Sequence, residues 1–489
     1  MLFLTLVCCI CFLWVLWKRK WKTAYSLPPA LSGKLPLIGH IHHFLGDTTQ
    51  IFETLRKITE ECDEKGGVIT LSIGPMTLYG ITDIDDCATI ANTSYKKAFY
   101  YDFSKPLVGE GIFSADVPKW KLHRKLLNPA LNVQILNGYM GIFNNQSKKL
   151  VEDLAVEVGK GSFDQFRYLL LNNLETVFQT LTCDGDGYTP LNVEYVESVQ
   201  NILNILTTKF LRVWFHIPFV YYFSEHRKAE LRCLKIIHDM SNRMIVKRKE
   251  KLKNMVQNNC YQNDSGKSKP LIDLMLQLAD DDGLTDQEIR ENIDTFLIAG
   301  FDTLSSALTC IFATLGSYPD VQNRAYEEVL EIFNDPDKDV DKNDLLKLVY
   351  VEAVIKETMR LYPMAFGVAR CTDTEVKLKN YTVPAGTNCL LGFWSMHRQS
   401  IWGSDAHQFR PERWLNPDTL PKNPNAYAPF SIGKRNCIGK SYAMMSMKVL
   451  VAHVLHRYRI TADVSKMKMK LDAVLKPASG YDISLENRI

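Results

Sequence analysis

The sequence predicts a mainly α-helical (α+β) fold with a small β component, and three observations support this. Thr285 and Glu288 have the spacing of a helix capping box and open a long apolar segment. Residues 68–73 and 76–81 alternate in polarity around a Gly-Pro turn and predict a β-hairpin. Most of the remaining chain has helical periodicity, apart from further short strands near 376–383.

The composition predicts one large catalytic body. A length of 489 residues would allow about three domains of typical size, but no Gly/Ser-rich linker divides the interior. Hydrophobic residues make up 46% of the chain and aromatic residues 11%, enough to enclose a core with room for a cofactor and a substrate. A net charge of +3 without a basic, aromatic-rich stripe excludes a nucleic-acid-binding protein.

The N-terminus is predicted to be a membrane anchor, residues 1–22. Residues 2–17 carry no charge and would rise about 24 Å as a helix, and a basic cluster follows them directly. Trp17 and Trp21 suit the membrane interface. The alternative is a cleaved signal peptide, but the charges follow the apolar segment and no small-residue cleavage site is present.

The remaining chain is then cytoplasmic by the positive-inside rule. A proline-rich segment, residues 23–39, is expected to be a semi-rigid hinge between the anchor and a single catalytic domain, residues 40–489. The twelve cysteines form no paired framework, which fits reduced thiols in the cytoplasm.

One cysteine lies in a sequence that is typical of metal ligation. In Phe430-Ser-Ile-Gly433-Lys-Arg435-Asn-Cys437-Ile-Gly439, a glycine-bounded turn leads into an apolar helix. A helix N-terminus favours a thiolate, so we expect a lowered pKa for Cys437. Gly433 permits the turn, Gly439 permits close approach of a flat cofactor, Arg435 can pair with a carboxylate, and Phe430 can shield the sulfur. The alternative for a single cysteine is an inert buried thiol.

This stretch matches the pattern F-x-x-G-x-R-x-C-x-G, and the chain therefore resembles the cytochrome P450 family. The resemblance extends from Pro28 to the C-terminus, because three further family motifs occur in the expected order along the chain. It implies a large helical body around haem b with a small β-rich lobe. It also implies that Cys437 is the axial thiolate ligand of the iron.

A second motif lies in the middle of the predicted long helix. Ala299-Gly300-Phe-Asp302-Thr303 resembles the family's oxygen-activation motif, A/G-G-x-D/E-T. In that reading Gly300 leaves room for dioxygen, Thr303 bonds back to a carbonyl or to water, and Asp302 relays protons. The alternative is an ordinary core helix that contains a threonine. Leu304 stands where the family often has a second hydroxyl residue.

Two further motifs concern the structure around the haem. Glu357 and Arg360 are spaced i, i+3, and the P-E-R-W segment adds Arg413 to form the family's buried structural triad. Trp120 and Arg124 match the family's W-x-x-x-R helix. The resemblance implies that this last pair faces a haem propionate. Arg370 and Arg435 are further candidate propionate partners.

The resemblance implies a monooxygenase that inserts one atom of O2 into a hydrophobic substrate. No dinucleotide or flavin fingerprint is present, so electrons must come from another protein. The NADPH-dependent cytochrome P450 reductase of the endoplasmic reticulum membrane is the expected partner, and cytochrome b5 is a second candidate. Four lysines lie near the cysteine motif and the W-x-x-x-R motif and are candidates for docking the reductase: Lys121, Lys125, Lys434 and Lys440.

Residues 294–303 resemble most closely the family 4 group, which is known for oxidation of fatty acids and, in insects, of hormones and xenobiotics. Ala299 replaces the glutamate that esterifies the haem in some members, so non-covalent haem is expected. Candidate substrate-contacting segments are 99–112, 364–368 and 479–481, together with Phe296 and the aromatic segment 210–223. That aromatic segment is either core packing or a membrane contact.

Two alternatives belong to other classes. A haem-thiolate isomerase would rearrange peroxides without a reductase, but its relatives usually lack the pair present here as Asp302 and Thr303. The other is a non-catalytic haem-binding or lipophile-binding membrane protein.

Overall fold

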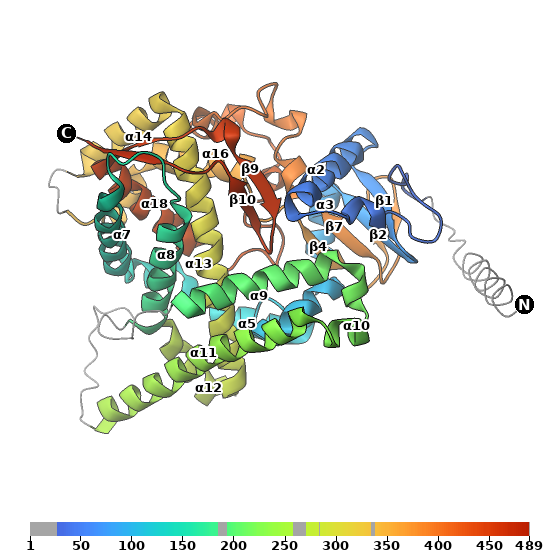
Figure 1. The fold of residues 1–489 in the computed structure, drawn as a ribbon, viewed down its shortest axis with the longest axis horizontal. Coiled ribbons are helices and arrows are strands. Elements are labelled where there is room, and N and C mark those ends of the chain that lie inside the picture. Colours follow the sequence, from blue (N-terminus) through green and yellow to red (C-terminus); the bar gives the residue numbers. More distant parts are fainter. Residues whose placement is uncertain (1–26, 184–192, 258–269, 283, 334–337, 489) are drawn as a thin grey trace, which may run out of the picture.

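The computed structural model describes residues 27–183, 193–257, 270–282, 284–333 and 338–488 (Figure 1). The predicted anchor at 1–22 lies outside the described residues. The hinge is described from Leu27 onward, and there it is bound to the sheet: Leu31 N donates to Thr70 O at 2.9 Å, and Thr70 N donates to Pro29 O at 2.9 Å. Backbone pairing therefore fixes this part of the segment to the β-rich lobe.

The largest sheet joins segments from both halves of the sequence. Its strand order is β1-β2-β7-β4-β3, where β2 and β7 are parallel and the other neighbours are antiparallel. The strands are β1 (Val68–Ile73), β2 (Met76–Ile81), β7 (Asn388–Leu391), β4 (Val368–Cys371) and β3 (Lys96–Lys97). The predicted hairpin of β1 and β2 is confirmed, with Val68 opposite Ile81.

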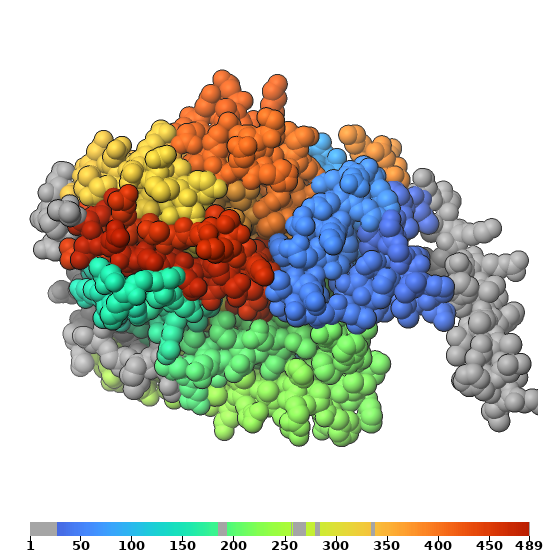
Figure 2. Space-filling view, turned by 45° about the horizontal axis from the view of Figure 1, so that its top comes forward, coloured from blue at the N-terminus to red at the C-terminus, as the bar shows by residue number. Residues whose placement is uncertain are grey.

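Three two-stranded sheets complete the β structure of the described residues. The predicted strands near 376–383 are confirmed as one of them, and the other two are made by C-terminal segments. Their strands are β5 (Val376–Lys377) with β6 (Thr382–Val383), β8 (Tyr458–Thr461) with β11 (Ser484–Asn487), and β9 (Lys468–Leu471) with β10 (Leu475–Ser479). Figure 2 shows the C-terminal segments, in red, beside the N-terminal lobe, in blue, with the teal and green helices below.

Helices form the larger part of the molecule. Those before the central helix are α2 (Thr48–Glu64), α3 (Ile84–Thr93), α4 (Lys105–Val108), α5 (Val117–Leu127), α6 (Val133–Asn137), α7 (Met140–Leu154), α8 (Phe166–Thr182), α9 (Val193–Leu211), α10 (Pro218–Tyr222), α11 (Glu225–Gln257) and α12 (Leu271–Asp282). The central helix and those after it are α13 (Asp286–Ser317), α14 (Pro319–Ile332), α15 (Lys342–Lys347), α16 (Val349–Leu361), α17 (Phe393–Met396) and α18 (Lys440–Arg457).

Helix α13 crosses the centre of the body (Figure 1). Its predicted capping box is confirmed: Glu288 N donates to Thr285 Oγ1 at 3.2 Å, and Thr285 N donates to Glu288 Oε2 at 2.9 Å. Among the described residues, α13 is the helix long and apolar enough to span a membrane, but 78% of its apolar stretch is buried inside the protein. It is therefore the core helix of the body, and α8, α11, α14 and α16 pack around it.

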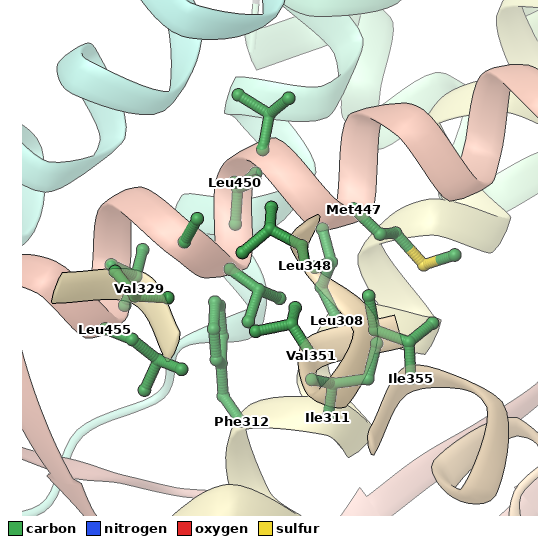
Figure 3. Packing of buried hydrophobic residues seen from close by; sticks show 14 of the residues in the cluster. Leu308, Ile311, Phe312, Val329, Leu348, Val351, Ile355, Met447, Leu450 and Leu455 are labelled. Carbon is green, nitrogen blue, oxygen red and sulfur yellow. The ribbon is translucent and has the colours of Figure 1, made fainter. Parts of the chain in front are cut away.

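The main hydrophobic core lies between α13, α14, α16 and α18. Figure 3 shows Leu308, Ile311 and Phe312 of α13 gathered with side chains of the other three helices. Phe312 and Leu450 of α18 are almost fully buried. Each such side chain contributes about 1.5–3 kcal/mol by leaving water, so this core fixes α18 and the loop before it against the central helix.

Candidate active site

The loop before α18 has the backbone geometry that its glycines predict. Gly433 has φ +74°, and a Cβ there would lie 2.5 Å from the carbonyl oxygen of Ala91 in α3, so a side chain is excluded. The loop closes on itself, because Cys437 N donates to Phe430 O at 2.8 Å. The Phe430 side chain packs against the main core.

Cys437 has accessible surface although protein encloses it deeply, so its side chain borders an internal hollow. Burial raises the pKa of the Cys437 thiol, against the opposing effects of the Gly439 backbone, Arg124 and Lys440. The predicted lowering of this pKa by the helix is therefore wrong for the protein alone. The reason is desolvation: burial of the thiol outweighs the hydrogen bond from the Gly439 backbone at the start of α18.

Gly439 is the N-cap residue of α18, with an ordinary φ of −86°. A Cβ at this position would meet Cys437 Sγ at 3.8 Å, an ordinary contact, and no other described atom closer than 4 Å. Neither the backbone conformation nor packing within the protein requires a glycine here. The open space lies beside the thiol, where a flat group would need it.

Three cations meet near this loop. Arg435, Arg370 of β4 and Lys97 of β3 form no ion pair with any described residue. Nε and Nη1 of Arg435 and Nε of Arg370 are buried without a hydrogen-bond partner, whereas Arg435 Nη2 donates to Ala115 O at 2.7 Å.

Burial and mutual repulsion lower the pKa values of these cations. The pKa of Arg435 falls to about 10 through burial and then through Arg370. The pKa of Lys97 falls well below its ordinary value through burial and then through both arginines. Lys97 and Arg435 line a cavity of about 240 Å³. Asp102 and Asp116 also line this cavity, and Asp116 partly offsets the lowering of the Arg435 pKa. Because neither aspartate forms an ion pair with these cations, the cavity has cationic donors left for further carboxylate groups.

Trp120 and Arg124 lie on α5, where they contact the same loop. The Arg435 guanidinium carbon lies 4.5 Å from the centre of the Trp120 ring. Arg124 Nη1 donates to Asn436 O at 2.7 Å, and Arg124 Nη2 donates to Asn436 Oδ1 at 2.9 Å. The sequence predicted that Arg124 faces a propionate. Both terminal nitrogens hold α5 against the cysteine loop, and each keeps a second N–H, so the propionate contact stays a prediction.

Helix α13 presents a stripe of accessible residues at its otherwise buried centre. Phe296, Ala299, Gly300 and Thr303 have accessible surface and recur at i, i+3, i+4 and i+7, which places them on one helix face. Thr303 Oγ1 donates to Ala299 O at 2.7 Å, the back-bond expected from the motif. This face is the part of α13 that can meet a bound molecule.

The structure corrects the role assigned to Gly300. A Cβ on Gly300 would lie 2.9 Å from Val177 Cγ2, so the glycine allows α8 to pack closely against α13. Its missing side chain points toward this helix contact. Space for dioxygen is therefore not the reason that position 300 requires a glycine.

Asp302 points away from the accessible stripe into a buried polar cluster. Its Oδ1 accepts hydrogen bonds from Lys476 Nζ at 2.7 Å and from Gln200 Nε2 at 2.9 Å. Both charged side chains are almost fully buried, Asp302 at 3% exposure and Lys476 at 4%. The acid of the predicted proton relay is thus held in an ion pair between α13 and β10, and its role as a relay stays a prediction.

The structure brings the three residues of the predicted triad together. Glu357 accepts hydrogen bonds from Arg360 Nε and Nη2, both at 2.9 Å, and from Arg413 Nε at 2.8 Å. All three side chains are fully buried. The Trp414 indole donates to Glu357 Oε2 at 3.0 Å, and Arg360 also donates to backbone carbonyls, so this cluster ties α16 to the segment before the cysteine loop.

Comparison with known proteins decides the family. The sequence matches the family model "Cytochrome P450" over residues 28–485. The chain belongs to the cytochrome P450 family. "Cytochrome P450 4V2" of Mus musculus is 30% identical over 485 residues, covering 97% of this chain and 92% of that protein. "Cytochrome P450 4c21" of Blattella germanica is 32% identical over 404 residues, covering 80% of each.

This cytochrome P450 is similar to family 4 members, including insect proteins. It is a haem-thiolate monooxygenase that inserts one oxygen atom of O2 into a hydrophobic substrate, with electrons from a redox partner. Its cofactor is haem b, bound through a cysteine thiolate without a covalent link. Neither the isomerase alternative nor the non-catalytic alternative is favoured.

The residues of this P450 fit a haem. The accessible thiol of Cys437 lies beside a glycine that protein packing does not require, and the Arg370, Arg435 and Lys97 cluster has donors for the two carboxylates that a haem carries. Sequence reasoning missed Lys97, since a lysine in a two-residue strand resembles any surface lysine. It also missed Lys476 and Gln200, because nothing near them in the sequence indicates their common partner.

The aromatic segment 210–223 is mostly exposed in the P450 body. Phe219, Tyr222 and Phe223 keep 73%, 68% and 67% of their surface accessible. The core-packing interpretation is therefore wrong for these side chains, although Tyr221 is buried. An exposed aromatic cluster of this kind marks a contact surface.

Proposed function

We propose that Cys437 is the axial ligand of the haem iron and that the hollow beside it is the site of oxygen insertion. The observation that carries this proposal is the accessible thiol of Cys437, two residues from the buried Arg435, whose guanidinium, like that of the buried Arg370, has nitrogens without a hydrogen-bond partner. Haem with a thiolate ligand activates O2 for attack on unactivated C–H bonds. The charge of the iron would deprotonate the Cys437 thiol and override the effect of burial on its pKa.

The chain's own residues then have distinct tasks. Arg370, Arg435 and Lys97 hold the propionates, because Lys97 and Arg435 line one cavity, Arg370 pairs with Lys97 across β3 and β4, and none of the three forms an ion pair with a described residue. Thr303 holds a proton at its hydroxyl on the accessible face of α13. Asp302, one residue earlier, connects that face to the buried cluster from which protons arrive. The Glu357 triad keeps the cysteine loop in place without touching reactants.

Electrons are supplied by the NADPH-dependent cytochrome P450 reductase, and cytochrome b5 is a second donor for the same face. Four exposed lysines surround the entry to the cysteine loop and would attract an acidic partner: Lys121, Lys125, Lys434 and Lys440. Loss of these charges should raise the KM for reductase more than it lowers kcat. High salt should reduce the difference in KM between the variant and the wild type.

The protein acts at the endoplasmic reticulum membrane, with its catalytic body in the cytoplasm. The charge pattern of residues 1–22 supports a single anchor, and the exposed aromatic segment 210–223 supports a second contact at the lipid interface. Protease added to sealed microsomes should digest the body. Protection of the body would contradict this orientation.

Substrates are hydrophobic molecules, and fatty acids, terpenoids, hormones and plant toxins are the classes to screen. Phe296 on the accessible stripe of α13 and Phe99 near α4 offer apolar surface. Difference spectra recorded while each compound is added would rank the classes.

The central test is the spectrum of the reduced, CO-bound protein. We expect the red-shifted Soret band of thiolate-bound haem in the wild type and its loss in Cys437→His. Cys233→Ser on α11 is the matched control, because it removes a buried thiol from another part of the body. Retention of the band in Cys437→His would exclude Cys437 as the ligand.

A further inference from the structure

The ion pair between Lys476 and Asp302 is part of a larger buried network. Lys476 Nζ lies 3.2 Å from Gln200 Oε1 and 4.0 Å from Asp472 Oδ2. Thr207 Oγ1 of α9 donates to Asp472 Oδ1 at 3.0 Å. The β9–β10 hairpin is thereby joined to α9 and α13. One lysine faces two carboxylates, and the nearer one belongs to the oxygen-activation motif.

Stability alone does not account for this pair. Removing two charges from water costs about as much as their attraction returns, and well-packed apolar residues would serve a core equally well. The geometry is specific instead. Lys476 and Gln200 both donate to Oδ1 of Asp302, and no described residue donates to Oδ2. One oxygen is anchored, and the other remains able to take a proton.

A route for water reaches this cluster from the surface. A groove of about 410 Å³ lies between α8 and α9, and Gln200 is one of its lining residues. Its other lining residues are the polar Arg167, Glu197 and Asn201, which are exposed, and four Leu and Val side chains: Leu170, Leu171, Val193 and Val196. Because its polar side is exposed, solvent water reaches Gln200 through this groove. Gln200 therefore contacts both the groove and the Asp302 carboxylate.

We propose that Lys476 is the positioning residue for Asp302 and that the groove between α8 and α9 supplies, past Gln200, the water that gives Asp302 its proton. The inference rests on the proposed function, since Asp302 must feed protons to oxygen reduction. Lys476 fixes Oδ1, which keeps Oδ2 where it takes a proton from water and passes it toward Thr303. Without Lys476, the buried carboxylate loses its cation and this orientation.

Oxygen itself reports on proton supply. One NADPH and one proton reduce O2 to hydrogen peroxide, whereas two NADPH and two protons reduce O2 to two waters and break the O–O bond. Slow proton delivery therefore shifts the product from water to peroxide. The ratio can be measured without any organic substrate, from NADPH oxidised, O2 consumed and peroxide formed.

The experiment uses the full-length haem protein with NADPH-dependent cytochrome P450 reductase in phosphatidylcholine vesicles. Lys476→Met should raise the peroxide-to-water ratio about tenfold, within the range by which a positioned proton donor acts. Lys476→Arg, which keeps the charge, should restore a ratio near that of the wild type. Lys468→Met is the matched control, because Lys468 is exposed on the same hairpin.

The double variant Lys476→Met/Asp302→Asn tests whether Lys476 acts through Asp302. Its ratio should equal that of Asp302→Asn alone. The double variant also leaves no unpaired charge at position 302, and Asp472 keeps its hydrogen bond from Thr207, so the test stays available if Lys476→Met fails to fold. An unchanged peroxide-to-water ratio in Lys476→Met, or additive effects in the double variant, would overturn the inference. The proposed function would stand as long as the wild type consumes O2 with NADPH. A wild type that consumes no O2 with NADPH would overturn the proposed function as well.

Discussion

Replacing Lys97 with methionine should weaken haem retention without disturbing the surrounding fold. Lys97 is enclosed by protein, its Nζ lies 3.5 Å from the centre of the Phe113 ring, and it forms no ion pair with any described residue. Burial, Arg370 and Arg435 all lower its pKa. In the haem-free protein, methionine would therefore remove a charge that the two arginines repel. The ammonium of Lys97 is needed only in the haem-bound protein.

The magnitude follows from the kind of contact. A hydrogen bond from an ammonium to a carboxylate contributes about 1.5–3 kcal/mol, so the Kd for haem should rise by about 10- to 150-fold. The two arginines remain, so binding is weakened and not abolished. Repulsion among the three cations in the haem-free protein offsets part of the gain, which favours the lower end of that range.

Haem transfer to excess apomyoglobin measures this loss without any turnover. We expect faster transfer from Lys97→Met than from the wild type, together with an unchanged Soret band of the reduced CO complex in the loaded fraction. Lys377→Met is the control, because Lys377 is an exposed lysine on a short strand, β5, and does not line this cavity. Equal transfer rates for the wild type and Lys97→Met, or an equal effect of Lys377→Met, would refute the reasoning.

Three further predictions concern stability and coupling. Glu357→Gln leaves the buried Arg360 without a counter-charge and leaves Arg413 with Asp405 alone. It should destabilise the body by about 3–5 kcal/mol in urea unfolding, against at most about 1 kcal/mol for Glu53→Gln at an exposed pair; losses of similar size in the two variants would contradict this. Burial raises the pKa of Asp294 from 3.8 to about 7, so between these two pH values the folded protein binds more protons than the unfolded chain. The free energy of unfolding should therefore fall as pH rises from 3.8 to about 7, by at most about 1.4 kcal/mol per pH unit, and Asp294→Asn should lack this pH dependence. An equal pH dependence in the wild type and in Asp294→Asn would exclude Asp294 as its source. Thr303→Ala should still bind substrate and accept electrons but form product about tenfold more slowly and release more peroxide, and unchanged coupling of NADPH to product would refute a role for its hydroxyl.

The sequence alone determined what short spacings encode. The capping box of α13, the hairpin of β1 and β2 and the turn at Gly433 each depend on a few neighbouring residues, and each is confirmed. The F-x-x-G-x-R-x-C-x-G and A-G-x-D-T motifs identified the residues around one site for the same reason. In such motifs the chain itself fixes the relative positions of the side chains.

Tertiary structure decided the partner of each side chain. Gly300 is required because α8 lies against α13, and Arg124 is taken by Asn436, 312 positions along the chain. The thiol pKa of Cys437 rises because burial depends on everything packed around it, not on the helix that follows.

The same distinction explains the residues that were missed. Lys97 meets Arg370 and Arg435, and Lys476 meets Asp302 at 174 positions' separation, only after distant segments pack together. A lysine looks alike in any sequence, whether solvated or buried. Its function depends on desolvation and on the charges brought within a few ångströms, and only the folded chain determines both.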